Sequence, residues 1–96
     1  MKRTTNPKAI EITRRFFNAL EMAIELGKID GVKNFCDAHS LNRVKYASMK
    51  NQLHLPVEQW QYKTIDVDAL AGIVTDFGVS ADWLLIGRGK MLKTDN

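Results

Sequence analysis

The feature that most constrains the fold is a long apolar stripe with helical spacing near the N-terminus of this 96-residue chain. Asn6 and Pro7 are typical of the start of a helix, and Gly27 is typical of its end. Between these signals, apolar side chains recur every three or four residues, at Ile12, Phe16, Ala19, Leu20, Ala23 and Leu26. This period is typical of a helix that buries one face. We therefore predict a first helix of about 20 residues.

Two short helices joined by a tight turn are expected next. The second helix spans residues 31–39 or 32–39, with Asp30 as its cap. After a connection over residues 40–42, Asn42 caps a third helix that ends near Leu53, before Pro56. The residues of the second helix that should face inward are Val32, Phe35 and Cys36.

Residues 54–64 show no clean period, and we expect an ordered loop or a single irregular turn there. Trp60 and Tyr62 lie in this loop. Aromatic side chains in a loop more often fix it to its own core than contact a partner or a base, which is the alternative.

The C-terminal third predicts two further helices. Asp66 caps the fourth, which Gly78 closes, and Ser80 caps a short fifth helix that stops at Gly87. The apolar residues assigned to the fourth helix are Val67, Leu70, Ala71, Val74 and Phe77. The chain therefore predicts an all-α fold of five helices in a single domain, residues 1–96.

Several classes of protein are disfavoured by composition. No apolar run approaches the roughly 20 residues of a membrane span, and the basic N-terminus has no apolar stretch behind it, so we expect no membrane partner and no signal peptide. The single cysteine, Cys36, is compatible with a reducing cytoplasm. Cys36 and His39 share a helical spacing, but two ligands make no closed zinc site, and His54 is the only other histidine. No catalytic set, cofactor motif or small-molecule site is evident, so we predict that the protein is not an enzyme.

The net charge of +3 is modest, but its distribution is uneven. Residues 1–10 and 38–57 together hold six of the 14 basic residues and none of the 11 acidic ones. Polyanion binding requires local positive potential rather than a high total charge. These basic residues are Lys2, Arg3, Lys8, Arg43, Lys45 and Lys50. The N-terminal group, with the arm assigned to residues 1–7, either touches DNA or is a solvated end.

The third helix has two distinct sides when residues are spaced at about 100°. Its inner side carries Tyr46, Met49 and Leu53. Its outer side carries Val44, Ala47, Ser48 and Asn51, flanked by Arg43 and Lys50 on one edge and by Lys45 and Gln52 on the other. Small and hydrogen-bonding residues between cationic borders suit the major groove of duplex DNA. The alternative is an ordinary solvated helix face.

Two segments of the chain carry a family resemblance. NFCDAHSLNRVKYASM, within the two-helix unit at residues 31–53, and DALAGIVTDFGVSADWLLIGRGKM, within the closing helices at residues 66–92, resemble the lambda-repressor-like helix-turn-helix family of phage and bacterial regulators. The resemblance implies a five-helix domain that binds operator DNA, usually as a dimer. The family often has Gln at the start of the first motif helix to hold a phosphate; here Lys33 is the substitute. The expected DNA-contacting residues are Asn42, Arg43, Val44, Lys45, Ala47, Ser48, Lys50, Asn51 and Lys33.

We therefore predict a transcriptional regulator of the phage-repressor type that binds double-stranded DNA, in the cytoplasm and on the nucleoid. Residues 83–86 are four consecutive large apolar residues, which cannot all enter one core from a short helix. We expect a homodimer through this helix around Trp83; the alternative is that the N-terminal helix covers the excess. Two rival functions are a DNA-binding antitoxin or accessory protein and a helical protein-interaction module without DNA binding.

Overall fold

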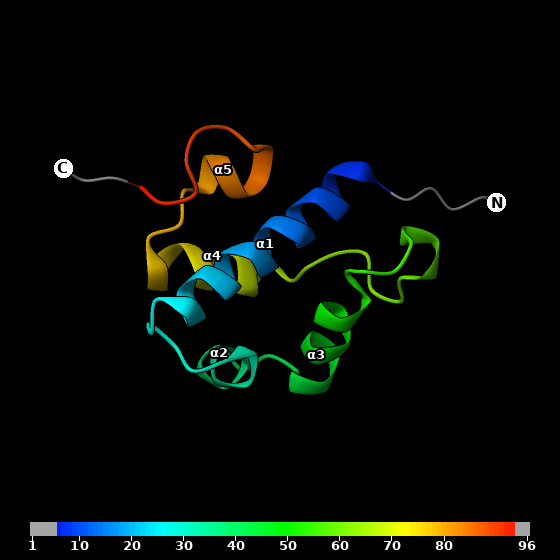
Figure 1. The fold of residues 1–96 in the computed structure, drawn as a ribbon, viewed down its shortest axis with the longest axis horizontal. Coiled ribbons are helices and arrows are strands. Elements are labelled where there is room, and N and C mark those ends of the chain that lie inside the picture. Colours follow the sequence, from blue (N-terminus) through cyan, green and yellow to red (C-terminus); the bar gives the residue numbers. More distant parts are fainter. Residues whose placement is uncertain (1–5, 94–96) are drawn as a thin grey trace.

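Five α-helices and one 3₁₀ helix are present in residues 6–93, which are the residues that the computed structural model describes (Figure 1). In chain order they are α1 (Pro7–Glu25), α2 (Val32–Ala38), α3 (Arg43–Gln52), η1 (Val57–Gln59), α4 (Val67–Phe77) and α5 (Ala81–Ile86). Within this range the only β-type pairing is one antiparallel bridge between Val79 and Leu92. The prediction of an all-α fold with a long first helix is confirmed.

The ends of the helices follow local signals. The side chain of Asn6 accepts a hydrogen bond from the backbone N–H two residues later, and Ser80 accepts one from the N–H three residues later. Gly78 and Gly87 end α4 and α5 with φ of 70° and 72°, in the left-handed region that glycine adopts without strain. These caps were predicted from the sequence and are confirmed.

Two predictions about the first two helices are wrong. Asp30 does not cap α2: the cap is Gly31, whose backbone is extended and which provides no side-chain hydrogen bond. Leu26 is exposed, because α1 ends one residue before it and the chain turns away from the core there. The buried face of α1 instead includes Thr13 and Phe17, which the apolar stripe omitted.

The apolar residues assigned to α4 are not equally buried. Val67 and Ala71 are exposed, whereas Leu70 and Val74 are half-buried. The buried positions are Ala69, Gly72, Ile73 and Phe77. Apolar residues occur on most sides of this helix, so its period is compatible with more than one inner face, and packing against α1 selects among them.

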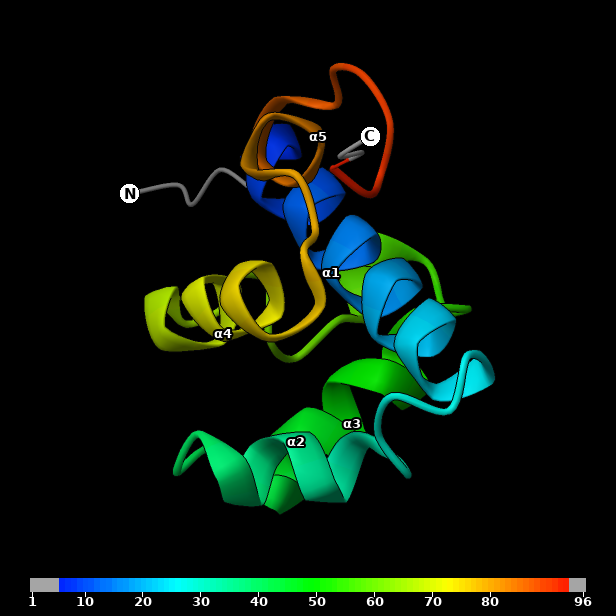
Figure 2. The same ribbon diagram turned by 90° about the vertical axis from the view of Figure 1, so that its left-hand side faces the viewer.

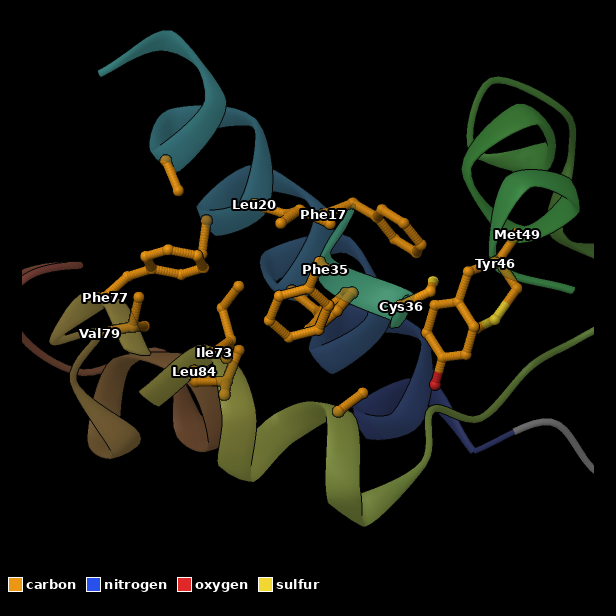
Figure 3. Packing of buried hydrophobic residues seen from close by; sticks show 14 residues of the cluster. Phe17, Leu20, Phe35, Cys36, Tyr46, Met49, Ile73, Phe77, Val79 and Leu84 are labelled. Carbon is orange, nitrogen blue, oxygen red and sulfur yellow. The ribbon is translucent and has the colours of Figure 1, made fainter. Parts of the chain in front are cut away.

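The core is built around aromatic rings from four helices. Phe16 of α1 is fully buried, and its ring centroid lies 5.0 Å from that of Phe17, 5.7 Å from Phe35 and 6.1 Å from Tyr46. Phe35 of α2 lies between Phe77 on one side and Tyr46 on the other (Figure 3). Edge-to-face ring pairs at these separations add to the stabilisation from apolar burial.

The helices divide the molecule into two ends. In both views α5 lies at one end and α2 with α3 at the other, with α1 running between them (Figures 1 and 2). No helix between residues 6 and 93 has the length and hydropathy needed to cross a bilayer. Most of the predicted basic arm, including Lys2 and Arg3, lies outside the described residues.

A glycine permits close approach of α2 to α4. Nε2 of His39, at the end of α2, lies 2.7 Å from Oδ2 of Asp76, and its ring centroid lies 4.6 Å from that of Phe35. A Cβ atom at Gly72 would lie 2.7 Å from Cε1 of this imidazole. Because Asp76 and Phe35 hold the ring on two sides, it cannot move away without losing one of these contacts.

Gly72→Ala is therefore expected to lower the free energy of unfolding by about 1–3 kcal/mol. An alanine inside a helix would otherwise stabilise by about 1 kcal/mol relative to glycine. Urea denaturation measures the effect, and the His39→Ala background is the control, where Gly72→Ala should be neutral or stabilising. Stabilisation by Gly72→Ala in the wild-type background would contradict the packing argument.

Candidate nucleic-acid interface

The turn between α2 and α3 is short and internally hydrogen-bonded. Ser40 adopts a left-handed conformation with φ of 58°, which reverses the chain. The next N–H, of Leu41, donates to the carbonyl of Cys36 at 2.8 Å. Asn42 then caps α3, its Oδ1 accepting from the N–H of Lys45 at 3.0 Å. The side-chain oxygen of Asn42 thus has a structural role in addition to its predicted place at the contact surface.

The inner side of α3 fixes this helix to the rest of the domain. Tyr46 and Met49 are fully buried, and Leu53 is half-buried, as predicted from the helical wheel. The hydroxyl of Tyr46 donates a 2.7 Å hydrogen bond to Oδ2 of Asp66, the residue before α4. Burial, and then this hydrogen bond, raise the pKa of Tyr46, so the hydroxyl remains a donor.

The outer side of α3 presents the residues that the sequence placed there. The side chains of Ala47 and Asn51 are exposed, Ser48 is half-buried, and Val44 is 77% exposed. A shallow groove of about 390 Å³ runs between Lys33 of α2 and the N-terminal half of α3. Its other lining residues are Arg43, Val44 and Ala47. Four of the nine predicted contact residues therefore line one groove on the outer surface of α2 and α3.

The positive charges of α3 do not stand alone, contrary to what the acid-free stretch 38–57 suggested. Each basic residue of the helix faces a carboxylate from another part of the chain. Nε of Arg43 lies 3.3 Å from Asp37, Nζ of Lys45 lies 3.4 Å from Asp66, and Nζ of Lys50 lies 3.7 Å from Glu21. The inference of an uncompensated basic patch on α3 is therefore corrected.

Lys45 lies deeper than a typical contact residue. Its ammonium lies 5.9 Å from the ring centroid of Tyr46 and 5.6 Å from that of Tyr62, within reach of both π faces. With Asp66 as its third neighbour, Lys45 is half-buried at the inner edge of α3. By contrast, Lys33 is exposed in the first turn of α2 and forms no ion pair with an acid of residues 6–93.

Gln52 was placed on the outer flank of α3 by its angle, and this is wrong. The residue is only 5% exposed. Its Oε1 accepts from the N–H groups of Gln61 and Tyr62 at 2.9 and 3.3 Å, and its Nε2 donates to the carbonyl of Tyr62. Gln52 therefore joins α3 to the following segment and is not available to a base.

The segment 54–64 is ordered around one 3₁₀ turn, as expected, and Trp60 fixes it. Nε1 of Trp60 donates to the carbonyl of Leu55 at 3.1 Å, and the ring is buried. The guanidinium of Arg14 lies 4.9 Å from the Trp60 ring centroid and donates to the carbonyl of Leu53. The contact of Arg14 with Trp60 ties the segment to α1, and the hydrogen bond to Leu53 ties the end of α3 to α1.

This segment places residues beside the outer side of α3 that periodicity did not identify. Gln59 and Gln61 are exposed and, with Ser48 and Asn51, line a second groove of about 230 Å³ beside α3. Neutral amides have no periodic signature in a loop. A possible sequence signal was the concentration of three glutamine residues between positions 52 and 61.

The candidate metal and nucleophile residues do not form a site. Cys36 is buried and free, and burial is the main cause that raises the pKa of its thiol. His39 pairs with Asp76 instead of facing Cys36 as a ligand partner. Over residues 6–93 no group of three or more histidine, cysteine or acidic side chains is placed to hold a metal ion.

Comparisons of the chain with protein-family models, with curated proteins and with solved structures found no match.

The pair between Tyr46 and Asp66 gives a pH-dependent prediction. The Tyr46 hydroxyl, and then the Lys45 ammonium, lower the pKa of Asp66 from its usual value of 3.8. A lowered folded-state pKa stabilises the fold above the unfolded value, and this stabilisation is lost as pH falls through the folded pKa.

Tyr46→Phe should therefore lower the free energy of unfolding at neutral pH by about 1 kcal/mol, since the carboxylate is partly screened by solvent. The difference from wild type should shrink as pH falls from about 6 to about 2.5. Urea denaturation across this range measures it, with Tyr62→Phe as the matched control. If the loss of stability in Tyr46→Phe stays constant with pH, the hydrogen bond to the Asp66 carboxylate is not its cause.

Proposed function

We propose that this protein binds duplex DNA through the outer side of α3 and acts as a transcriptional regulator of the phage-repressor type, in the cytoplasm and on the nucleoid. The observation that carries the proposal is the outer side of α3, whose exposed valine, alanine and amide side chains lie opposite an inner side that is packed into the core. The resemblance of residues 29–91 to the lambda-repressor-like family supports the same reading.

The chemistry of this face suits a major groove. An exposed valine in the first turn of α3, Val44, has no partner in the core, and its methyl groups match the thymine methyl. Ala47 allows close approach, and Asn51 presents an amide that can pair with adenine. Lys33 and Arg43, on either side of the α2–α3 groove, are suitably placed for phosphates.

Duplex affinity should fall steeply as salt rises from about 50 to 200 mM, because phosphate contacts release counterions. Replacing Lys33 by alanine should weaken binding and reduce the salt slope by about one unit. Arg88→Ala is the control, since Arg88 follows α5 at the opposite end of the molecule.

Fluorescence anisotropy with duplexes selected from a random pool makes the measurement. The proposal fails if no sequence is enriched and no duplex is bound at low salt. It also fails if Lys33→Ala and Arg88→Ala weaken binding equally.

We further propose that two copies associate through α4 and α5. Trp83 is half-buried against the core, so the expected interface moves to its neighbours Leu85 and Ile86, which are 43% and 60% exposed. An almost wholly apolar groove of about 510 Å³ lies beside them between the two helices. Its lining residues are Val67, Leu70, Ala71, Val74, Thr75, Ala81, Leu84 and Leu85.

Leu85→Asp should convert the protein to a monomer, because a charge would be buried without a partner in the apolar contact. Sedimentation equilibrium measures the mass, and Leu26→Asp, at an exposed apolar position outside the groove, should leave it unchanged. A Leu85→Asp protein with the mass of the wild-type dimer would exclude this interface.

The apolar groove also favours a second candidate function. If the wild type is a monomer, the groove is open to a different protein, as expected of a DNA-binding antitoxin or accessory protein. A protein-interaction module without DNA binding would also suit the paired charges of α3 and this groove. Duplex binding at low salt separates the two functions, because the proposed regulator should bind duplex DNA under these conditions and the interaction module should not.

A further inference from the structure

The basic residues of α3 share one feature. The helix contains three of them, and each faces a carboxylate from a different element: Asp37 in α2, Asp66 before α4 and Glu21 in α1. These carboxylates are distant from their partners in sequence, apart from Asp37. The charges of Arg43, Lys45 and Lys50 are thus already countered within the fold.

Two of the three pairs are open to exchange. Arg43 and Asp37 are 52% and 56% exposed, and Lys50 and Glu21 are 46% and 50% exposed. A phosphate oxygen approaching α3 can therefore replace either carboxylate. The third carboxylate, Asp66, also accepts the Tyr46 hydroxyl and has a structural role.

Paired cations change the balance between two modes of duplex binding. Non-specific binding depends almost entirely on phosphates and the release of their counterions. A lysine or arginine that must first break its ion pair with a carboxylate contributes less to the free energy of phosphate binding. Contacts to base edges by the neutral residues Val44, Ala47 and Asn51 are unaffected by the pairing.

We propose that Glu21 and Asp37 are specificity-determining residues, which compete with phosphates for Lys50 and Arg43 and so weaken binding to duplexes of the wrong sequence. This inference rests on the proposed function. The carboxylates contact no base; they act by making phosphate contacts of α3 conditional on the fit of its neutral face.

The test compares Asp37→Asn, Glu21→Gln and the double variant with the wild type on a mixed-sequence duplex. Each single change should tighten binding about two- to five-fold, the range expected for exposed ion pairs. The double variant should tighten it further and should show a steeper salt dependence. On a duplex selected from the random pool the tightening should be smaller, and equal tightening on both duplexes would overturn the role in specificity. Thermal unfolding verifies that the variants remain folded.

Asp82→Asn is the matched control, because it removes one negative charge on α5, at the opposite end of the molecule from α3 (Figure 2). Less than two-fold tightening is expected from it. Equal tightening by Asp82→Asn would show that net charge alone acts, and would overturn the inference.

The remaining outcomes separate this inference from the proposed function. Duplex binding by the wild type that the variants leave unchanged overturns the inference and leaves the proposed function intact. Absence of binding by wild type and variants alike, even at low salt, overturns both. Binding by the double variant alone supports the inference, because the carboxylates then mask the cations completely.

Discussion

The arrangement of this protein depends on the burial of one ring, that of Phe16. It is fully buried in the middle of α1, and rings from α2 and α3 meet it at 5.7 and 6.1 Å. Because both short helices pack on the same ring, their mutual angle follows from the packing of aromatic edges and not from the turn between them alone. The orientation of α3 is therefore a consequence of core packing. The face that carries Val44 is exposed because the opposite face of the helix is buried in the core.

Tyr46 connects this core to the polar side of the site. Its ring belongs to the aromatic cluster, while its hydroxyl reaches Asp66 and so fixes the start of α4 against α3. A carboxylate in this position would ordinarily cap α4, but Asp66 makes no side-chain capping bond and serves Tyr46 and Lys45 instead. Asp66 thus links α3 to the start of α4 through Tyr46, and its ion pair holds Lys45 partly away from solvent. Packing and electrostatics of the candidate interface are coupled at this point.

Three helix caps set by neighbouring residues were predictable from the sequence, although the cap of α2 was not, whereas several contacts between distant residues were missed. The capping of α1 by Asn6, of α3 by Asn42 and of α5 by Ser80 depends on residues two or three positions away, and all three were predicted. Gln52 lies within the periodic part of α3, yet its side-chain oxygen accepts a hydrogen bond from a backbone N–H nine residues later. A helical wheel does not represent such a contact. Counting charges along the chain likewise missed the pair of Lys50 with Glu21, since 29 positions separate them. The outer face of α3 was therefore predictable in composition but not in charge.

The two ends of the molecule have complementary requirements under the proposed function. An α3 whose cations are already paired gives one copy of the chain weak attraction to phosphates, so a single interface holds duplex DNA poorly. Joining two copies makes the second contact intramolecular and raises the overall affinity without any new charge. No residue of α3 lines the apolar groove between α4 and α5, so an occupant of the groove need not cover the outer face of α3. Weak individual contacts joined in pairs favour sites in which both halves fit, because a mismatch in either half removes the gain from joining.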